Sequence, residues 1–196
     1  MVYVDSLAVM LLSLGLSSLV IALYFIGKAA NKKWLGELVV PAFTLGLFDF
    51  LSGFVMSFQW PLPGSYNMLF GDPILMLGLI MMAGAYMLHK NTNPRILSIF
   101  GFFLGIYIAV ELAGIIAFNL EGPVSFAFSP SNHFVTAFGL YLFAALSALF
   151  SPIAFADPKG SGKYAYYLLA ILLIITALIA LFIGYGGIFD HLGSPP

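Results

Sequence analysis

The sequence predicts an all-α, polytopic integral membrane protein with six transmembrane helices. Of its 196 residues, 62% are hydrophobic and only 8% are charged, whereas about 25% of the residues in an ordinary soluble domain are charged. The chain also contains six apolar segments, most of them near the roughly 20 residues that a helix needs to cross a bilayer. We expect a single transmembrane domain over residues 1–196, in contact with the lipid bilayer.

The first three spans are predicted from apolar runs and the turn-forming residues beside them. The first run ends at Gly27, and it is no cleaved signal peptide because it lacks a basic start and carries Asp5 instead. The third run is the shortest, and Tyr66 to Phe70 can extend it. The predicted spans are Leu7–Ile26, Leu38–Phe58 and Pro73–Leu88.

The last three spans follow from the same pattern. Asn93-Pro94 separates the third span from the fourth, and Asp157-Pro158 with Gly160-Ser161-Gly162 separates the fifth from the sixth. The predicted spans are Ile96–Phe118, Phe134–Phe155 and Ala165–Ile183. No segment between the spans is long or polar enough to form a separate soluble domain.

The basic residues predict the orientation of the chain. All seven fall in the turns after the first, third and fifth spans: Lys28, Lys32, Lys33, Lys90, Arg95, Lys159 and Lys163. Basic residues concentrate on the cytoplasmic side of membrane proteins. We therefore expect three helical hairpins joined by cytoplasmic turns, in the cell (plasma) membrane, with the N-terminus and the C-terminus both extracellular.

The composition excludes several classes of function. The net charge of −1 offers no basic surface for nucleic acid, and the absence of cysteine excludes disulfides, thiolate nucleophiles and iron–sulfur clusters. No P-loop, HExxH or GxSxG motif occurs. We expect no enzyme activity, no cofactor and no nucleic-acid partner.

Two acidic residues fall inside predicted spans. Asp49 lies eleven residues into the second span, about 16 Å along that helix, and Glu111 lies in the outer half of the fourth. Ser52 shares the helix face of Asp49, and Tyr107 precedes Glu111 by one turn, from where its phenol can hydrogen-bond the carboxyl. Ser13, Ser17 and Ser18 form a further polar stripe in the first span.

These carboxyl groups have two main interpretations, because charge is expensive at bilayer depth. They can serve only as hydrogen-bonding links between helices, or they can line a path for a solute or for protons. A metal site built from both is disfavoured because no histidine lies at their depth, and we expect no metal.

The outer loops and the histidines carry weaker signals. The loops Gln59–Asp72 and Asn119–His133 contain no Lys or Arg and are rich in aromatic residues and proline, which is typical of an interfacial aromatic belt or of a lid over a solute path. His133 and His191 are expected outside the membrane, either as solvated side chains or as an external pH sensor. No histidine pair lies within the spans to ligate haem.

The segment WPLPGSYNMLFGDP, Trp60 to Pro73, resembles the characteristic loop of an uncharacterised family of archaeal membrane proteins. That resemblance extends over most of the chain and implies about six spans and a membrane location, with no assigned activity.

The stretch FGDPILMLGLIMMAGAYMLHKNTNPRILSIF is similar, more distantly, to part of the urea and short-chain amide channels. That resemblance implies six helices arranged as three hairpins around a pore. The chain departs from that family in the fifth span, where Phe138, Tyr141 and Phe143 stand in place of tryptophans.

The leading hypothesis is a passive channel or facilitator for a small neutral polar solute, similar to urea or an amide, with Asp49, Ser52, Tyr107 and Glu111 lining or ordering the path. The protein is then expected to form a homo-oligomer. The alternative is a non-catalytic accessory subunit of a larger membrane complex, such as a respiratory assembly, in contact with other membrane subunits. A proton-coupled carrier driven by the two carboxyls is a third possibility.

Overall fold

The chain folds entirely into helices in the computed structural model, which describes residues 6–62, 64–120, 137–156 and 162–193. The elements are α1 (Ser6–Ala29), the 3-10 helix η1 (Lys33–Leu38), α2 (Val39–Gln59), α3 (Tyr66–His89), α4 (Arg95–Ala117), α5 (Gly139–Leu149), α6 (Ser151–Ala156) and α7 (Gly162–Gly193). Six helical segments of this described part are long and apolar enough to cross a membrane, with η1 continuing into α2 and α5 into α6. The predicted all-α, six-span class is confirmed.

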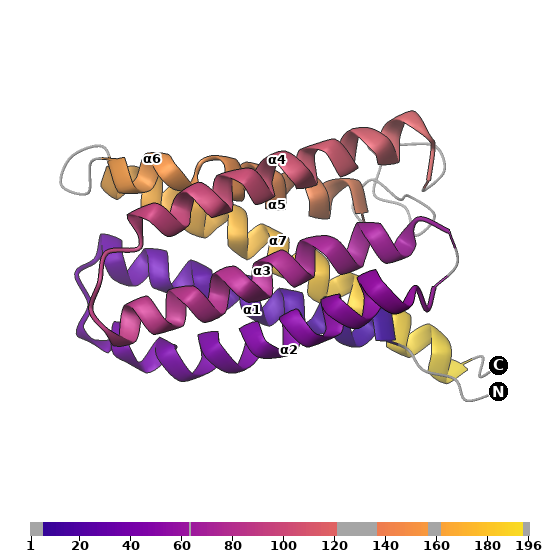
Figure 1. Cartoon of the computed structure of the whole chain (residues 1–196), viewed down its shortest axis with the longest axis horizontal. Coiled ribbons are helices and arrows are strands. Elements are labelled where there is room, and N and C mark those ends of the chain that lie inside the picture. Colours follow the sequence, from indigo (N-terminus) through magenta and orange to yellow (C-terminus); the bar gives the residue numbers. More distant parts are fainter. Residues whose placement is uncertain (1–5, 63, 121–136, 157–161, 194–196) are drawn as a thin grey trace.

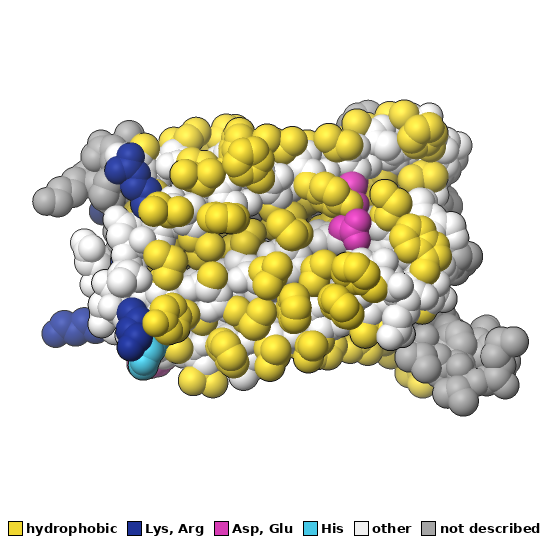
Figure 2. All heavy atoms as spheres, in the orientation of Figure 1, with side chains coloured by type: hydrophobic (Ala, Val, Ile, Leu, Met, Phe, Trp, Pro, Cys, Tyr) yellow, Lys and Arg dark blue, Asp and Glu magenta, His cyan; other side chains and the backbone are white. Residues whose placement is uncertain are grey.

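The helices run along the long axis of the molecule, and most of the turns between them gather at its two ends (Figure 1). Helix α1 begins and α7 ends at the same end of the bundle. The dark blue Lys and Arg side chains lie at the opposite end, beyond a broad apolar surface (Figure 2). Lys159 lies outside the described residues. The predicted separation of the basic turns from the chain's ends is confirmed, and the assignment of membrane sides stays a prediction.

The most extensive helix contacts differ from the predicted hairpins. Helix α2 packs mainly on α3, α1 on α7, and α4 on α5, whereas the helices joined by the first two basic turns, α1 with α2 and α3 with α4, touch less. Glycines explain the closest pair, because Gly46 and Gly53 of α2 lie directly against the backbone of α3. Small residues of this kind allow membrane helices to approach closely.

Helices α1, α3 and α4 are each followed, two residues after their last residue, by an asparagine in the left-handed region: Asn31, Asn91 and Asn119. After α1, the Lys32 N–H donates to the carbonyl of Gly27 at 2.9 Å, and the equivalent bond after α3 joins Thr92 to Met87 at 2.9 Å. Asparagine tolerates this backbone conformation and closes the helix by satisfying its last carbonyls. The turns at the basic end are therefore short and fixed by local sequence.

Helix α3 begins at Tyr66, seven residues before the predicted start at Pro73. Proline lacks an N–H and usually interrupts a helix because the carbonyl four residues earlier loses its donor. Here that carbonyl belongs to Leu69, and the hydroxyl of Tyr141 from α5 donates to it. The helix therefore continues through Pro73, and Asp72, predicted in an outer loop, lies inside α3.

The fifth and sixth spans also differ in detail. The fifth is divided between α5 and α6 at Phe150 and Ser151, because Pro152 cannot donate a helical hydrogen bond. Residues 134–136 of this predicted span lie outside the described residues. Helix α7 extends ten residues beyond the predicted end at Ile183, since Gly184, Gly186 and Gly187 do not stop it.

Candidate functional site

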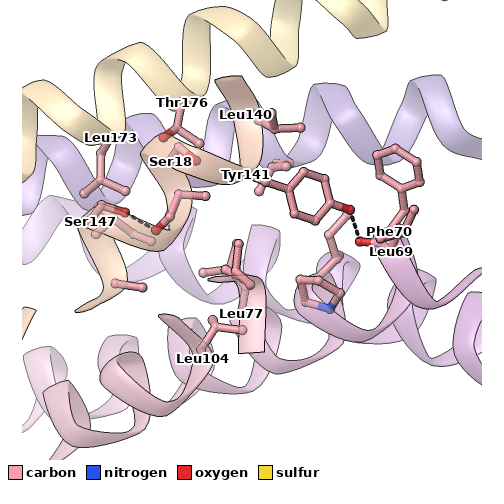
Figure 3. A pocket seen from close by; sticks show the side chains of 17 residues that line it. Ser18, Leu69, Phe70, Leu77, Leu104, Leu140, Tyr141, Ser147, Leu173 and Thr176 are labelled. Carbon is pink, nitrogen blue, oxygen red and sulfur yellow. Dashed lines mark hydrogen bonds between the residues drawn. The ribbon is translucent and has the colours of Figure 1, made fainter. Parts of the chain in front are cut away.

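Two adjoining cavities lie between the helices at the centre of the bundle. The outer cavity, distant from the basic end, has a volume of about 90 Å³ and is formed by α1, α3, α4, α5 and α7 (Figure 3). The inner cavity, towards the basic end, has a volume of about 190 Å³. Six residues line both: Ile21, Leu77, Leu104, Ser147, Ala148 and Leu173. The two spaces therefore meet at the middle of the bundle.

The walls of the outer cavity are mostly aliphatic, with hydroxyl groups from Ser18, Tyr141, Ser147 and Thr176. Most of these hydroxyls are already engaged by the protein itself. Ser147 donates to the carbonyl of Ala144 at 2.8 Å, and Thr176 donates to the carbonyl of Leu172 at 2.9 Å. The hydroxyl of Ser18 makes no hydrogen bond to any described residue, so it can bind a guest.

Phe70 and Tyr141 stand side by side at the outer end of this cavity. Their rings meet edge to face with centroids 6.3 Å apart. The Tyr141 hydroxyl is held by the Leu69 carbonyl that Pro73 leaves free, as the dashed line in Figure 3 shows. The hydrogen bond from Tyr141 to the Leu69 carbonyl therefore helps to hold this aromatic pair at the outer end of the cavity.

The inner cavity contains one polar group that the protein does not satisfy. The hydroxyl of Tyr24 is buried and has no hydrogen-bond partner among the described residues. The hydroxyl of Ser151, by contrast, donates to the carbonyls of Ala148 at 2.7 Å and Ser98 at 3.0 Å. A buried hydroxyl without a partner loses about 1–3 kcal/mol of hydrogen-bond energy. Tyr24 therefore lines the inner cavity and carries a buried hydroxyl without a partner among the described residues.

Asp49 forms a link between helices rather than part of either cavity wall. It is fully buried, and its two carboxyl oxygens accept hydrogen bonds of 2.5 Å each from Ser13 and Ser17 of α1. The two polar stripes noted in the first and second spans thus face each other. The serines lie one helical turn apart, which places both on the face that α1 presents to α2.

Ser52 lies beside Asp49 on α2 and is half-buried. Its hydroxyl donates to the carbonyl of Asp49 in its own helix at 3.3 Å. Ser52 therefore makes a local backbone bond and lines neither cavity.

Glu111 and Tyr107 lie together on α4, and the phenol has a different partner from the one predicted. Tyr107 donates to Oδ2 of Asp72 on α3 at 2.8 Å. Both carboxyl oxygens of Glu111 are buried and lack a hydrogen-bond partner among the described residues. None of Asp49, Ser52, Tyr107 and Glu111 is among the residues that line the two cavities.

The histidines add no site to the described structure. His133 lies outside the described residues, and His191 lies in α7 without a described side chain. The described ranges contain no group of three or more His, Cys, Asp or Glu side chains that could hold a metal ion.

Sequence reasoning missed Asp72, Tyr24 and the cavity hydroxyls of α5 and α7. Asp72 falls in the predicted outer loop Gln59–Asp72. Tyr24 lies beyond the serines that form the polar stripe of the first span, and Thr176 is an isolated hydroxyl in the last span, so no local pattern marks either residue as facing a cavity.

Comparison with known proteins places the chain in a family. The family described as "Protein of unknown function (DUF981)" matches residues 1–194. Neither the curated proteins nor the solved structures include a match to the chain. Because the match extends over nearly the whole length, the chain belongs to this family of proteins of unknown function.

Proposed function

We propose that the protein is a passive facilitator for a small neutral solute, located in the cytoplasmic membrane with both termini outside. The observation that carries this proposal is the pair of adjoining cavities at the centre of a bundle of six membrane-length helices. They extend from Leu88 and Pro94 near the basic end to Phe70 and Tyr141 towards the other. Small-molecule sites are commonly apolar clefts between helices with a few polar groups.

The cavity walls favour a solute that carries few polar atoms. An apolar cavity of about 150 Å³ stays dry and can admit a molecule as large as benzene. The inner cavity, at about 190 Å³, is of this size, and its mostly apolar lining includes Tyr24, Ser98, Ser147 and Ser151. A solute that is part methyl and part hydrogen-bonding group matches these walls better than one that is polar all round.

The cavity walls should favour some of the solutes that the distant resemblance to urea and amide channels suggests over others. Acetamide presents a methyl group to the aliphatic walls, whereas each polar group of urea must find a partner or lose about 1–3 kcal/mol. We expect acetamide to cross about tenfold faster than urea, since about 1.4 kcal/mol corresponds to a factor of ten.

Stopped-flow light scattering on proteoliposomes tests the proposal with acetamide, urea and glycerol. The Ala148→Phe variant should abolish flux, because Ala148 lines both cavities and a phenyl ring would fill their junction. Ala113→Phe is the matched control, since Ala113 is exposed on α4 and lines neither cavity. Flux equal to that of empty liposomes, or an unaffected Ala148→Phe variant, would refute the proposal.

The alternative role, an accessory subunit of a larger membrane complex, makes a different prediction. Purification from native membranes in a mild detergent would then yield other membrane proteins at a fixed ratio. Recovery of the chain as a homo-oligomer alone, together with solute flux, favours the facilitator.

A further inference from the structure

Two acidic side chains, Asp72 of α3 and Glu111 of α4, lie where these helices meet and outside both cavities. Asp72 lies six residues after the first residue of α3, and Glu111 lies six residues before the last residue of α4. At 1.5 Å per residue, each carboxyl is about 9 Å inside its helix end. Figure 2 shows the resulting magenta patch over α3 and α4, surrounded by hydrophobic side chains. These carboxyl groups therefore lie at membrane depth.

If both carboxyl groups are ionised, the hydroxyl of Tyr107 cannot supply hydrogen bonds to both Asp72 and Glu111. Tyr107 has a single hydroxyl proton, which it donates to Asp72 at 2.8 Å. Glu111 is only 8% exposed, and neither of its carboxyl oxygens has a partner among the described residues. Glu111 also interacts electrostatically with Asp72, a like charge when both are ionised, and with the Tyr107 hydroxyl, whose proton is directed to Asp72.

No counter-ion faces this patch in the described part of the chain. Helix α4 packs against α3, α5 and α6. Helices α5 and α6 contain no acidic or basic residue, and their tyrosine, Tyr141, bonds to the carbonyl of Leu69. The other titratable groups of α3 and α4 are Tyr66 in the first turn of α3, and Tyr86, His89 and Arg95, which lie towards the basic end. Helix α3 also packs on α2, where Asp49 is held by two serines, and on η1, which carries Lys33 and Glu37 at the basic end.

We propose that Asp72, Tyr107 and Glu111 form a proton-binding site at membrane depth, in which Glu111 carries the proton and Asp72 is the neighbouring carboxylate. An ionised carboxylate without a donor or a cation is very unfavourable in an apolar medium. A bound proton removes that charge and needs no cavity, and these three residues line neither of the two cavities described above.

Infrared spectroscopy of the purified chain in lipid bilayers at pH 7 tests this site without any solute. The wild-type protein should show the C=O stretching band of a protonated carboxyl group. The Glu111→Gln variant should lose the intensity of one carboxyl per chain. Glu37→Gln is the matched control, because Glu37 is exposed in η1, and it should leave this band unchanged.

A second variant keeps the test decisive if Glu111→Gln does not fold. In Asp72→Asn the band of Glu111 should persist and shift in frequency, because the group beside it changes from a carboxylate to an amide. Absence of a protonated-carboxyl band at pH 7, full retention of the band in Glu111→Gln, or an unshifted band in Asp72→Asn would each overturn the proposal. The result does not depend on whether the cavities conduct a solute.

Discussion

Replacing Gly78 by alanine should force α2 and α3 apart and destabilise the bundle. A Cβ atom built on Gly78 would lie 2.3 Å from the backbone nitrogen of Phe50 and 2.6 Å from the carbonyl oxygen of Gly46. Both atoms belong to the backbone of α2, so no side chain can rotate away. The whole helix must move instead.

The size of the effect follows from these distances. Carbon atoms pack at about 3.5–4.0 Å, so the helices must separate by roughly 1 Å, and a gap of that size forfeits about half of the dispersion energy across it. Overpacking of this kind lowers the free energy of unfolding by about 1–3 kcal/mol. The higher helix propensity of alanine offsets about 0.8–1.0 kcal/mol of this loss. Because the clash is with backbone, we expect a net loss of about 2 kcal/mol.

Gly114→Ala is the matched control. A Cβ atom there would meet only Cδ2 of Phe118, at 3.9 Å, which is an ordinary contact. This variant should therefore be neutral or gain up to about 1 kcal/mol from helix propensity. The assay is denaturant unfolding in mixed micelles, followed by far-ultraviolet circular dichroism. If Gly78→Ala unfolds at the same denaturant concentration as Gly114→Ala, the packing argument is wrong.

Three further predictions concern hydrogen bonds and orientation. Ser17→Ala removes one of the two hydrogen-bond donors to Asp49 and should cost about 0.6–1.7 kcal/mol of unfolding free energy in the same assay. Ser18→Ala breaks no hydrogen bond and should not have this cost. Equal losses in the two variants would contradict the role of Asp49 as a link between α1 and α2. Tyr141→Phe should cost about 1–3 kcal/mol of unfolding free energy by leaving the Leu69 carbonyl unpaired. The loss should shrink in a Pro73→Ala background, where residue 73 regains its N–H. An identical loss in both backgrounds would show that the hydroxyl does not replace the missing N–H of Pro73. Because the chain has no cysteine, single cysteines introduced at Gln59 and Asn91 can be labelled in intact cells with a membrane-impermeant maleimide. We expect Gln59→Cys to react in intact cells and Asn91→Cys to react only after permeabilisation. The reverse pattern would show that the chain has the opposite orientation.

The features of the fold that depend on composition and on local sequence signals could be predicted from the sequence. Six spans follow from apolar length, and the predicted end of the first span at Ile26, before Gly27, lies three residues before the last residue of α1. The buried position of Asp49 follows from the cost of exposing a carboxyl group on an otherwise apolar helix.

The start of α3 at Tyr66 was anticipated only as a possible extension of the third span over Tyr66 to Phe70, because local sequence does not show that Tyr141 of another helix supplies the donor that Pro73 lacks. The partner of Tyr107 was missed for a similar reason. Glu111 is its neighbour along the helix, but Asp72 becomes its acceptor only once α3 and α4 are packed. The cavities lie where several helices meet, and no local pattern in a single span specifies them.

The packing of α1 on α7 has a consequence for biosynthesis. Gly15 of α1 lies against Leu181, and Gly184 of α7 lies against Leu12, so α1 makes its main contact with a helix that the ribosome synthesises much later. At about 5–20 residues per second, the ribosome needs on the order of ten seconds to deliver that partner. During this interval the serines of α1 can already bind Asp49, which tethers the first helix to the growing assembly. A nascent chain released before α7 would leave the groove around Gly15 open to lipid or to a membrane chaperone.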